Sequence, residues 1–226
     1  YFERGYLYRL KERNETFFAI AAHDCFTSDD FWHVMDALPL PDIETFSVEC
    51  LGATSTSIAE NFARRYGHMM TSEEFWGKTR QYRKDRGQQD NIPLKTGLIE
   101  LLDYLRDRGY KIAVATFTNY EKVMHNFDVT GVQGRFDAVV CGDMISRSKP
   151  APDIYLRAAE LLGVAPQECM ALEDSPNGIR SAAAANLRVI MVPDLVMPNL
   201  ELRELTVTVQ SDLFGVQKFL EKFGDL

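Results

Sequence analysis

The stretch CMALEDSPNGIRSAAAANLRVIMVPD, residues 169–194, contains a predicted strand, a predicted helix and a second predicted strand in direct succession. Two mainly apolar runs, 169–172 and 188–193, flank an alanine-rich segment that predicts the helix. Neither run alternates apolar with polar residues, which is typical of strands buried on both faces of a parallel sheet. The stretch therefore predicts a βαβ unit whose sheet is covered by helices.

The alternation of strands and helices continues outward from this unit across residues 92–226. Further strands are expected at 110–116, 136–142 and, more weakly, 207–211. Further helices are expected at 96–109, 119–127, 151–163 and 212–224. This order predicts an α/β fold in which a Rossmann-like parallel sheet forms the core, residues 92–226.

Residues 1–91 contain almost no short β-branched runs and predict a separate, small helical domain. The segment 55–67 repeats large apolar side chains at four-residue spacing, which indicates one face of a helix. The segment 71–87 opens with a Thr-x-x-Glu capping box, a signature of a helix N-terminus. The chain is thus expected to divide into a helical domain, 1–91, and an α/β core, 92–226.

The composition argues against several classes of protein. The 226 residues are 46% hydrophobic and 26% charged, as in ordinary globular proteins, and no apolar run approaches the ~18 residues of a membrane span. The net charge of −8, without a basic cluster, argues against binding to nucleic acid or anionic membranes. The four cysteines and four histidines lack metal-binding spacing, which argues against zinc and is typical of reduced thiols in a cytoplasmic protein.

Polar side chains follow the predicted strands at their carboxyl ends, where open α/β sheets bind ligands. One strand ends in a threonine, another ends in adjacent glutamate and aspartate, and a lysine lies in a proline-containing loop before a helix. Because the carboxyl ends of parallel strands meet at one edge, these side chains are expected to converge there. The set expected to converge is Thr116, Lys149, Glu173 and Asp174, while Asp143 and Asp194 also follow strands.

This combination of a hydroxyl, a lysine and paired carboxylates suits the binding of phosphate and Mg²⁺. Adjacent carboxylates repel one another, and burial increases that cost unless a cation lies against them. Carboxylates hold Mg²⁺, a hard cation that keeps several waters, while lysine and hydroxyl groups stabilise a phosphoryl group during transfer. The alternative is that the polar groups only cap helices, because the Ser-Pro-Asn-Gly after the acids also begins a helix.

Three segments resemble motifs II, III and IV of the haloacid dehalogenase-like hydrolase superfamily. They are KIAVATFTN (111–119), SKPAPDIYLRAAELLG (148–163) and ALEDSPNGIRSAAAANLRVIMVPD (171–194). The most similar branch is that of the β-phosphoglucomutase-like phosphatases. Residues 37–67 are similar to the helical cap of these enzymes, and residues 91–105 to the return from cap to core.

The resemblance implies roles for the matching residues. Thr116 would hold the transferring phosphoryl group, and Lys149 would neutralise that group and the attacking carboxylate. Asp174 would bind Mg²⁺ directly, and Glu173 would bind it or orient its water. Substrate-binding positions are implied for Thr118, Asn119 and, on the cap loop, Gly52.

The nucleophile motif of the family is not found in this sequence. The resemblance implies two aspartates, two residues apart, after the first strand. The candidate is Asp24, which follows the apolar run 17–22, but Phe26 stands where the second aspartate belongs. Three explanations remain open: a segment before Tyr1 carries the first strand and the motif, Asp24 is a degenerate nucleophile, or the protein is catalytically silent. If the first explanation holds, the central position of the sheet in this chain would be filled by Phe17–Ala22 or by another segment.

The resemblance implies a Mg²⁺-dependent phosphatase that acts on a small phosphorylated metabolite, such as a sugar phosphate, through an aspartyl-phosphate. One alternative is a sugar-phosphate mutase, which needs cationic residues in the cap for a second phosphate; Arg64 and Arg65 are the candidates. Another is a silent protein that binds without turnover. Dehalogenation is disfavoured, because that branch would not need the acid pair Glu173 and Asp174.

Overall fold

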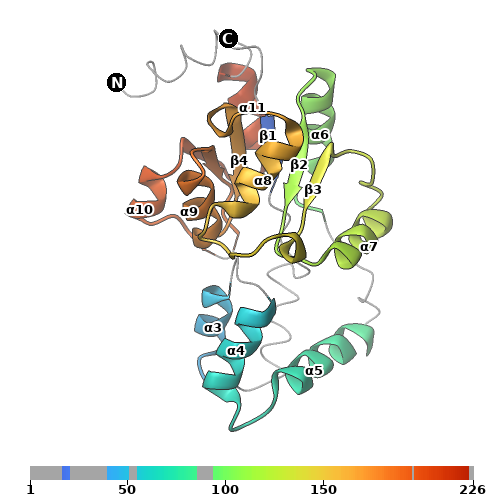
Figure 1. The fold of residues 1–226 in the computed structure, drawn as a ribbon, viewed down its shortest axis with the longest axis vertical. Coiled ribbons are helices and arrows are strands. Elements are labelled where there is room, and N and C mark those ends of the chain that lie inside the picture. The colour runs from blue at the N-terminus through green and yellow to red at the C-terminus, as the bar shows by residue number, and fades with distance from the viewer. Residues whose placement is uncertain (1–16, 21–39, 51–54, 86–93, 195, 224–226) are drawn as a thin grey trace.

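The computed structural model describes residues 17–20, 40–50, 55–85, 94–194 and 196–223. Its centre is a six-stranded sheet with the strand order β3-β2-β1-β4-β5-β6, in which every neighbouring pair is parallel (Figure 1). The strands are β1 (Phe17–Ile20), β2 (Ile112–Ala115), β3 (Ala138–Val140), β4 (Cys169–Glu173), β5 (Arg188–Met191) and β6 (Thr208–Val209). The predicted α/β fold with a Rossmann-like parallel sheet is confirmed.

The central strand, β1, corrects the predicted extent of the helical region. Phe17–Ile20 lies between β2 and β4, so it belongs to the core sheet, although the sequence placed it within 1–91. The physical reason is that the sheet needs a strand between β2 and β4, and a short aromatic and apolar run is a typical strand sequence. Of the two alternatives left open for this slot, the structure thus has the run that begins at Phe17.

Helices cover both faces of the sheet, as the continuous apolar strands predict. In β4, Ala171 packs in the cluster that includes α8 and α9, whereas Met170 and Leu172 pack in the cluster that includes α6 and α11. Neighbouring residues of a strand point to opposite faces, so both faces of this strand are apolar. The helices are α6 (Leu98–Asp107), α7 (Tyr120–Thr130), α8 (Asp153–Leu162), α9 (Pro176–Ala184), α10 (Leu200–Glu204) and α11 (Leu213–Phe223), with 3-10 helices at Gly142–Met144 and Pro166–Glu168.

Three further helices form a group of their own below the sheet in Figure 1. They are α3 (Ile43–Glu49), α4 (Ser55–Tyr66) and α5 (Ser72–Asp85). Their shared core contains the rings of Phe46, Phe62, Tyr66 and Phe75. The predicted capping box is present before α5, because the Glu74 N–H donates to Thr71 Oγ1 and the Thr71 N–H donates to Glu74 Oε2. Within the described ranges, no helix combines the length and the apolar character needed to cross a membrane.

Candidate active site

The register of the central strands sets the geometry of the carboxyl edge. Ile20 of β1 pairs with Val114 on one side and with Leu172 on the other. Thr116 and Asp174, each two residues further on, are therefore level with one another across β1, roughly 10 Å apart at two strand spacings. Two predicted residues, Asp24 and Gly52, lie outside the part of the chain that the structure describes.

Glu173 holds Lys149 in a buried ion pair at this edge. Glu173, at the end of β4, is 2% exposed, and its Oε1 lies 2.5 Å from Lys149 Nζ. The hydroxyl of Tyr155, on α8, donates to the same oxygen. Burial alone would raise the pKa of the Glu173 carboxyl, but Lys149, Tyr155 and the Ser175 N–H outweigh it and hold that pKa below its ordinary value. The carboxylate is therefore ionised and fixes the lysine.

The other oxygen of Glu173 faces the N-terminus of α9. Glu173 Oε2 accepts hydrogen bonds from the Asp174 N–H, from the Ser175 N–H and from Ser175 Oγ, at 3.2, 3.3 and 3.0 Å. Ser175 Oγ in turn accepts the Gly178 N–H and caps the helix. A Cβ at Gly178 would lie 2.0 Å from the Glu173 carboxyl, so only glycine fits there. Both oxygens of Glu173 are therefore engaged by the protein.

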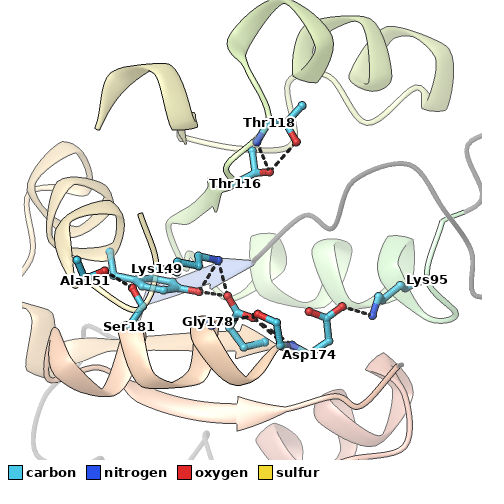
Figure 2. Close-up of polar contacts among 11 residues, drawn as sticks. Lys95, Thr116, Thr118, Lys149, Ala151, Asp174, Gly178 and Ser181 are labelled. Carbon is cyan, nitrogen blue, oxygen red and sulfur yellow. Dashed lines mark hydrogen bonds and ion pairs between the residues drawn. The ribbon is translucent and has the colours of Figure 1, made fainter. Parts of the chain in front are cut away.

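The loop that carries Lys149 is tied to the same helix. Ser181, on α9, donates from its hydroxyl to the Ala151 carbonyl at 2.6 Å, as Figure 2 shows. Two side chains therefore position Lys149: the Glu173 carboxylate at the end of β4, and the Ser181 hydroxyl on α9, which holds the loop. The sequence predicted Lys149 and Glu173 at one edge but gave no sign that Tyr155 and Ser181 support them.

The second group at the edge is a pair of threonine hydroxyls after β2 (Figure 2). Thr116 Oγ1 and Thr118 Oγ1 are 3.0 Å apart, and the Thr118 N–H donates to Thr116 Oγ1 at 3.2 Å. Both side chains are buried. Asn119 has a different task, because its Oδ1 accepts the Lys122 N–H and caps α7. The hydroxyl pair thus lies directly before the N-terminus of a helix, a favourable setting for an anion.

The third group joins two carboxylates through a lysine. Lys95 Nζ lies 3.0 Å from Asp174 Oδ2 and 3.4 Å from Asp194 Oδ2. Burial alone would lower the pKa of the Lys95 ammonium, but Asp174 and Asp194 outweigh it and hold that pKa above its ordinary value. The lysine is therefore charged at neutral pH. Sequence reasoning placed both aspartates at this edge but missed Lys95, which follows Pro93 and Leu94 before α6.

The donor set is compatible with magnesium. Among the described residues, no group of three or more His, Cys, Asp or Glu side chains is arranged to hold a metal ion. Asp174 and Asp194 already share one cationic group, so the pair attracts positive charge. One or two carboxylates suffice to hold Mg²⁺, which keeps several waters of its own. Asp143 does not join this pair, because its Oδ2 accepts the Tyr120 N–H of α7.

Known proteins with similar sequences indicate the family of this chain. A family model described as haloacid dehalogenase-like hydrolase matches residues 34–192. Hexitol phosphatase B of Escherichia coli O157:H7 is 34% identical over 138 residues, which covers 56% of this chain and 61% of that protein. The chain spans 9% of the length of one curated relative it matches, and about half the length of three others, with 46%, 56% and 61%.

Solved structures share the fold. β-Phosphoglucomutase from Clostridium difficile matches with a TM-score of 0.68 at 17% identity, covering 93% of this chain and 98% of that one. CbbY from Rhodobacter sphaeroides in complex with xylulose-(1,5)bisphosphate matches with a TM-score of 0.64 at 24% identity, covering 86% and 93%. These likenesses confirm the fold that the motifs predict. Because the family model covers more than half of its residues, this chain belongs to the haloacid dehalogenase-like hydrolase family.

Proposed function

We propose that the protein is a Mg²⁺-dependent phosphatase that acts on a small phosphorylated metabolite, such as a sugar phosphate. The observation that carries this proposal is the arrangement of the carboxyl edge. Thr116 and Asp174 each stand two residues after a register partner of Ile20, and Glu173, at the end of β4, holds Lys149 in a buried ion pair. The names of hexitol phosphatase B and of the CbbY complex with a sugar bisphosphate support the substrate class.

In this proposal, Lys149 and the threonine pair bind the phosphoryl group. The Lys149 ammonium neutralises negative charge on the phosphate, and its position does not need to change during the reaction because Glu173 fixes it. Thr116 and Thr118 contain two hydroxyl protons, of which one is used between them, so the other can donate to a phosphate oxygen.

The same proposal assigns the metal to Asp174, with Asp194 as its neighbour. Mg²⁺, when bound, would neutralise charge that develops on the phosphoryl group. For Glu173 the resemblance allows a direct or an indirect role. Its engaged oxygens favour the indirect one, in which it positions Lys149 and the backbone before α9.

The cap arginines favour a phosphatase over a mutase. A mutase must hold a second phosphate, for which Arg64 and Arg65 are the candidates in the cap. Arg64 donates to Asn61 Oδ1, and Arg65 forms an ion pair with Glu49 at 2.9 Å. Both guanidinium groups therefore already have partners among the helices α3 and α4.

A second candidate function is phosphate binding without turnover. It is favoured by the residue that stands after β1 at the position matching Thr116 and Asp174, because that residue has no carboxyl group. Thr116 stands two residues after Val114, and Asp174 two residues after Leu172. The residue two positions after their β1 partner, Ile20, is Ala22, and the first carboxyl group after β1 belongs to Asp24. The nucleophile is therefore the part of the proposed reaction that needs the sharpest test.

The experiment is a phosphate-release assay on p-nitrophenyl phosphate and a panel of sugar phosphates, with Mg²⁺ or with EDTA. The wild type is compared with Asp24→Asn, Asp174→Asn and the control Asp85→Asn on the exposed end of α5. Mg²⁺-dependent release that both Asp24→Asn and Asp174→Asn abolish, while the control retains it, is the expected result. Binding of inorganic phosphate by a folded protein without release would instead leave two explanations, a silent protein or a nucleophile carried by a segment before Tyr1.

A further inference from the structure

We infer that Ser181 is a positioning residue for the proposed phosphate site, because its hydroxyl fixes the loop that carries Lys149 and thereby sets where the Lys149 ammonium lies. The inference rests on the proposed function, in which Lys149 contacts the phosphoryl group. It assigns to α9 a residue that acts through the backbone of the loop rather than on the phosphate itself.

The Ser181 hydroxyl is buried in a helix that otherwise favours alanine. Ser181 is 0% exposed, and four alanines, 182–185, follow it. Serine forms helices less readily than alanine, and a buried hydroxyl is unfavourable unless it has a hydrogen-bond partner. In many helices that partner is the carbonyl four residues earlier. Here the hydroxyl donates instead to the Ala151 carbonyl, 30 positions earlier in the chain, at 2.6 Å. Its hydrogen bond therefore serves the loop and not the helix.

The carbonyl that Ser181 holds belongs to the loop and not to the helix that follows it. Ala151 precedes α8, and the first turn of α8 bonds to the Pro152 carbonyl instead. The Ala151 N–H donates to the Ser148 carbonyl at 2.9 Å, which closes a turn around Lys149. Both backbone groups of Ala151 are thus engaged, one within the turn and the other by α9.

The segment between Lys149 and α8 transmits this anchor to the lysine. Pro150, Ala151 and Pro152 follow the lysine directly. Each proline ring fixes φ near about −65°, and a residue that precedes a proline is restricted as well. The segment therefore has few soft dihedral angles that could absorb a displacement at Ala151. Such a displacement reaches the backbone of Lys149, two residues earlier.

The ammonium of Lys149 is held by the same helix that holds its backbone. Lys149 Nζ lies 2.5 Å from Glu173 Oε1, and the Glu173 carboxyl packs against Gly178, where a Cβ would lie 2.0 Å away. Gly178 and Ser181 are three residues apart, so they lie on one side of α9. Figure 2 shows both residues on this helix and the hydrogen bond from Ser181 to Ala151. One helix therefore fixes both ends of the lysine, the ammonium through Glu173 and the backbone through Ser181.

These two anchors determine the direction of the donor that remains for phosphate. The Lys149 ammonium has three N–H groups, of which one donates to Glu173 Oε1. Without the Ser181 hydroxyl, the ammonium keeps this partner while its backbone shifts, so a remaining N–H no longer points at the phosphate. A misplacement of about 1 Å can lower a rate by about 10²-fold, and we expect a loss of about tenfold in affinity for phosphate from the smaller shift that one hydrogen bond allows.

The test is isothermal titration calorimetry of the full chain with inorganic phosphate, in buffer that contains MgCl₂. Ser181→Ala removes the hydroxyl, and Ser181→Thr retains one at the same position. Thr130→Val is the matched control, because it removes a hydroxyl that also donates to a backbone carbonyl at 2.6 Å, that of Asn126 in α7. Circular dichroism verifies that each variant is folded.

A double-mutant cycle with Lys149→Met separates positioning from a general structural effect. If Ser181 acts through the lysine, Ser181→Ala should change the affinity for phosphate by less than about twofold once the lysine is absent. A general structural effect would lower the affinity by the same factor in both backgrounds. Where Lys149→Met does not fold, Lys149→Met/Glu173→Gln provides the background, because it leaves no buried charge without a partner.

We expect phosphate binding to weaken by about tenfold in Ser181→Ala and to stay within about threefold of the wild type in Ser181→Thr and Thr130→Val. If Lys149→Met weakens binding but Ser181→Ala does not, or if Ser181→Ala causes the same loss in both backgrounds, the role of Ser181 is wrong and the proposed function stands. Wild-type affinity in Lys149→Met would show that the proposed phosphate role of Lys149 is wrong, and the inference with it. If the wild type binds no phosphate, both are wrong.

Discussion

Lys149 and Glu173 form a buried ion pair, with 2.5 Å between Lys149 Nζ and Glu173 Oε1. Their side chains are 5% and 1% exposed, so water cannot replace either partner. Removal of one partner leaves a buried charge without compensation, which typically costs about 3–5 kcal/mol. We expect Lys149→Met to lower the free energy of unfolding by about this amount, as measured by urea denaturation at neutral pH.

The double variant Lys149→Met/Glu173→Gln provides the control for this prediction. Because it removes both charges, it should be clearly more stable than the sum of the two single changes predicts. Additive losses would mean that the two side chains do not stabilise each other.

The ion pair should also make stability depend on acid pH. Burial would raise the pKa of Glu173, but Lys149 and Tyr155 lower it below its ordinary value of 4.5. The unfolded chain therefore binds this proton more tightly than the folded protein does. The contribution of the pair is complete above the unfolded value and is lost as the pH falls through the lower folded value. From about pH 5 to about pH 3, the free energy of unfolding should fall more steeply in the wild type than in Glu173→Gln. Parallel curves for the two proteins would contradict the shift.

Gly178 should be intolerant of any side chain. A Cβ there would lie 2.0 Å from the Glu173 carboxyl, so Gly178→Ala must displace the carboxylate and with it Lys149. We expect a loss of at least about 2 kcal/mol in the free energy of unfolding, within the range known for overpacking. Gly77→Ala in α5 is the matched control, because a Cβ there meets only Arg80 Nη2 at 4.0 Å. That change should be neutral or stabilise the protein by up to about 1 kcal/mol. Equal effects of the two changes would exclude the steric explanation.

Much of the carboxyl edge of the sheet could be predicted, because its residues follow apolar runs that clearly indicate strands. Thr116, Lys149 and Asp174 each stand at the end of an apolar run or in a short loop beside one, and parallel strands bring such positions together. The partners of these residues could not be predicted in the same way. Lys95 is 79 positions from Asp174 along the chain, and its place depends on how the loop before α6 fits on α11.

One element was left open by the sequence and another was missed. The run from Phe17 was one of two ways to fill the central position of the sheet, and the structure places Phe17–Ile20 there, between β2 and β4. The helix α10, Leu200–Glu204, has five residues, too few for a hydrophobic period to be recognised. Its signal is the Asn199 side chain, which accepts the Leu202 N–H as a helix cap.

Tyr155 should act as a positioning residue for Glu173. Its hydroxyl donates to Glu173 Oε1, and burial together with the nearby Glu173 carboxylate raises the pKa of Tyr155, so the proton stays on the hydroxyl. Tyr155→Phe keeps the packed ring and removes only this hydrogen bond, which should cost about 1–3 kcal/mol in the free energy of unfolding. The pKa of Glu173 should also rise, so that acid unfolding begins at a higher pH than in the wild type. If Tyr155→Phe begins to unfold in acid at the same pH as the wild type, the hydroxyl does not position the carboxylate.

The threonine pair gives the most direct test of phosphate binding. Thr116 Oγ1 accepts the Thr118 N–H and lies 3.0 Å from Thr118 Oγ1, so one hydroxyl proton lies between the two oxygens. If the other hydroxyl proton stabilises charge on the transferring phosphoryl group, Thr116→Ala should lower kcat/KM by about 10²–10³, whereas Thr116→Ser should stay within about threefold of the wild type. Should the wild type release no phosphate, calorimetry with inorganic phosphate makes the same comparison, with weaker binding expected for Thr116→Ala alone. Equal turnover or equal phosphate affinity in the alanine and serine variants would remove Thr116 from the binding site.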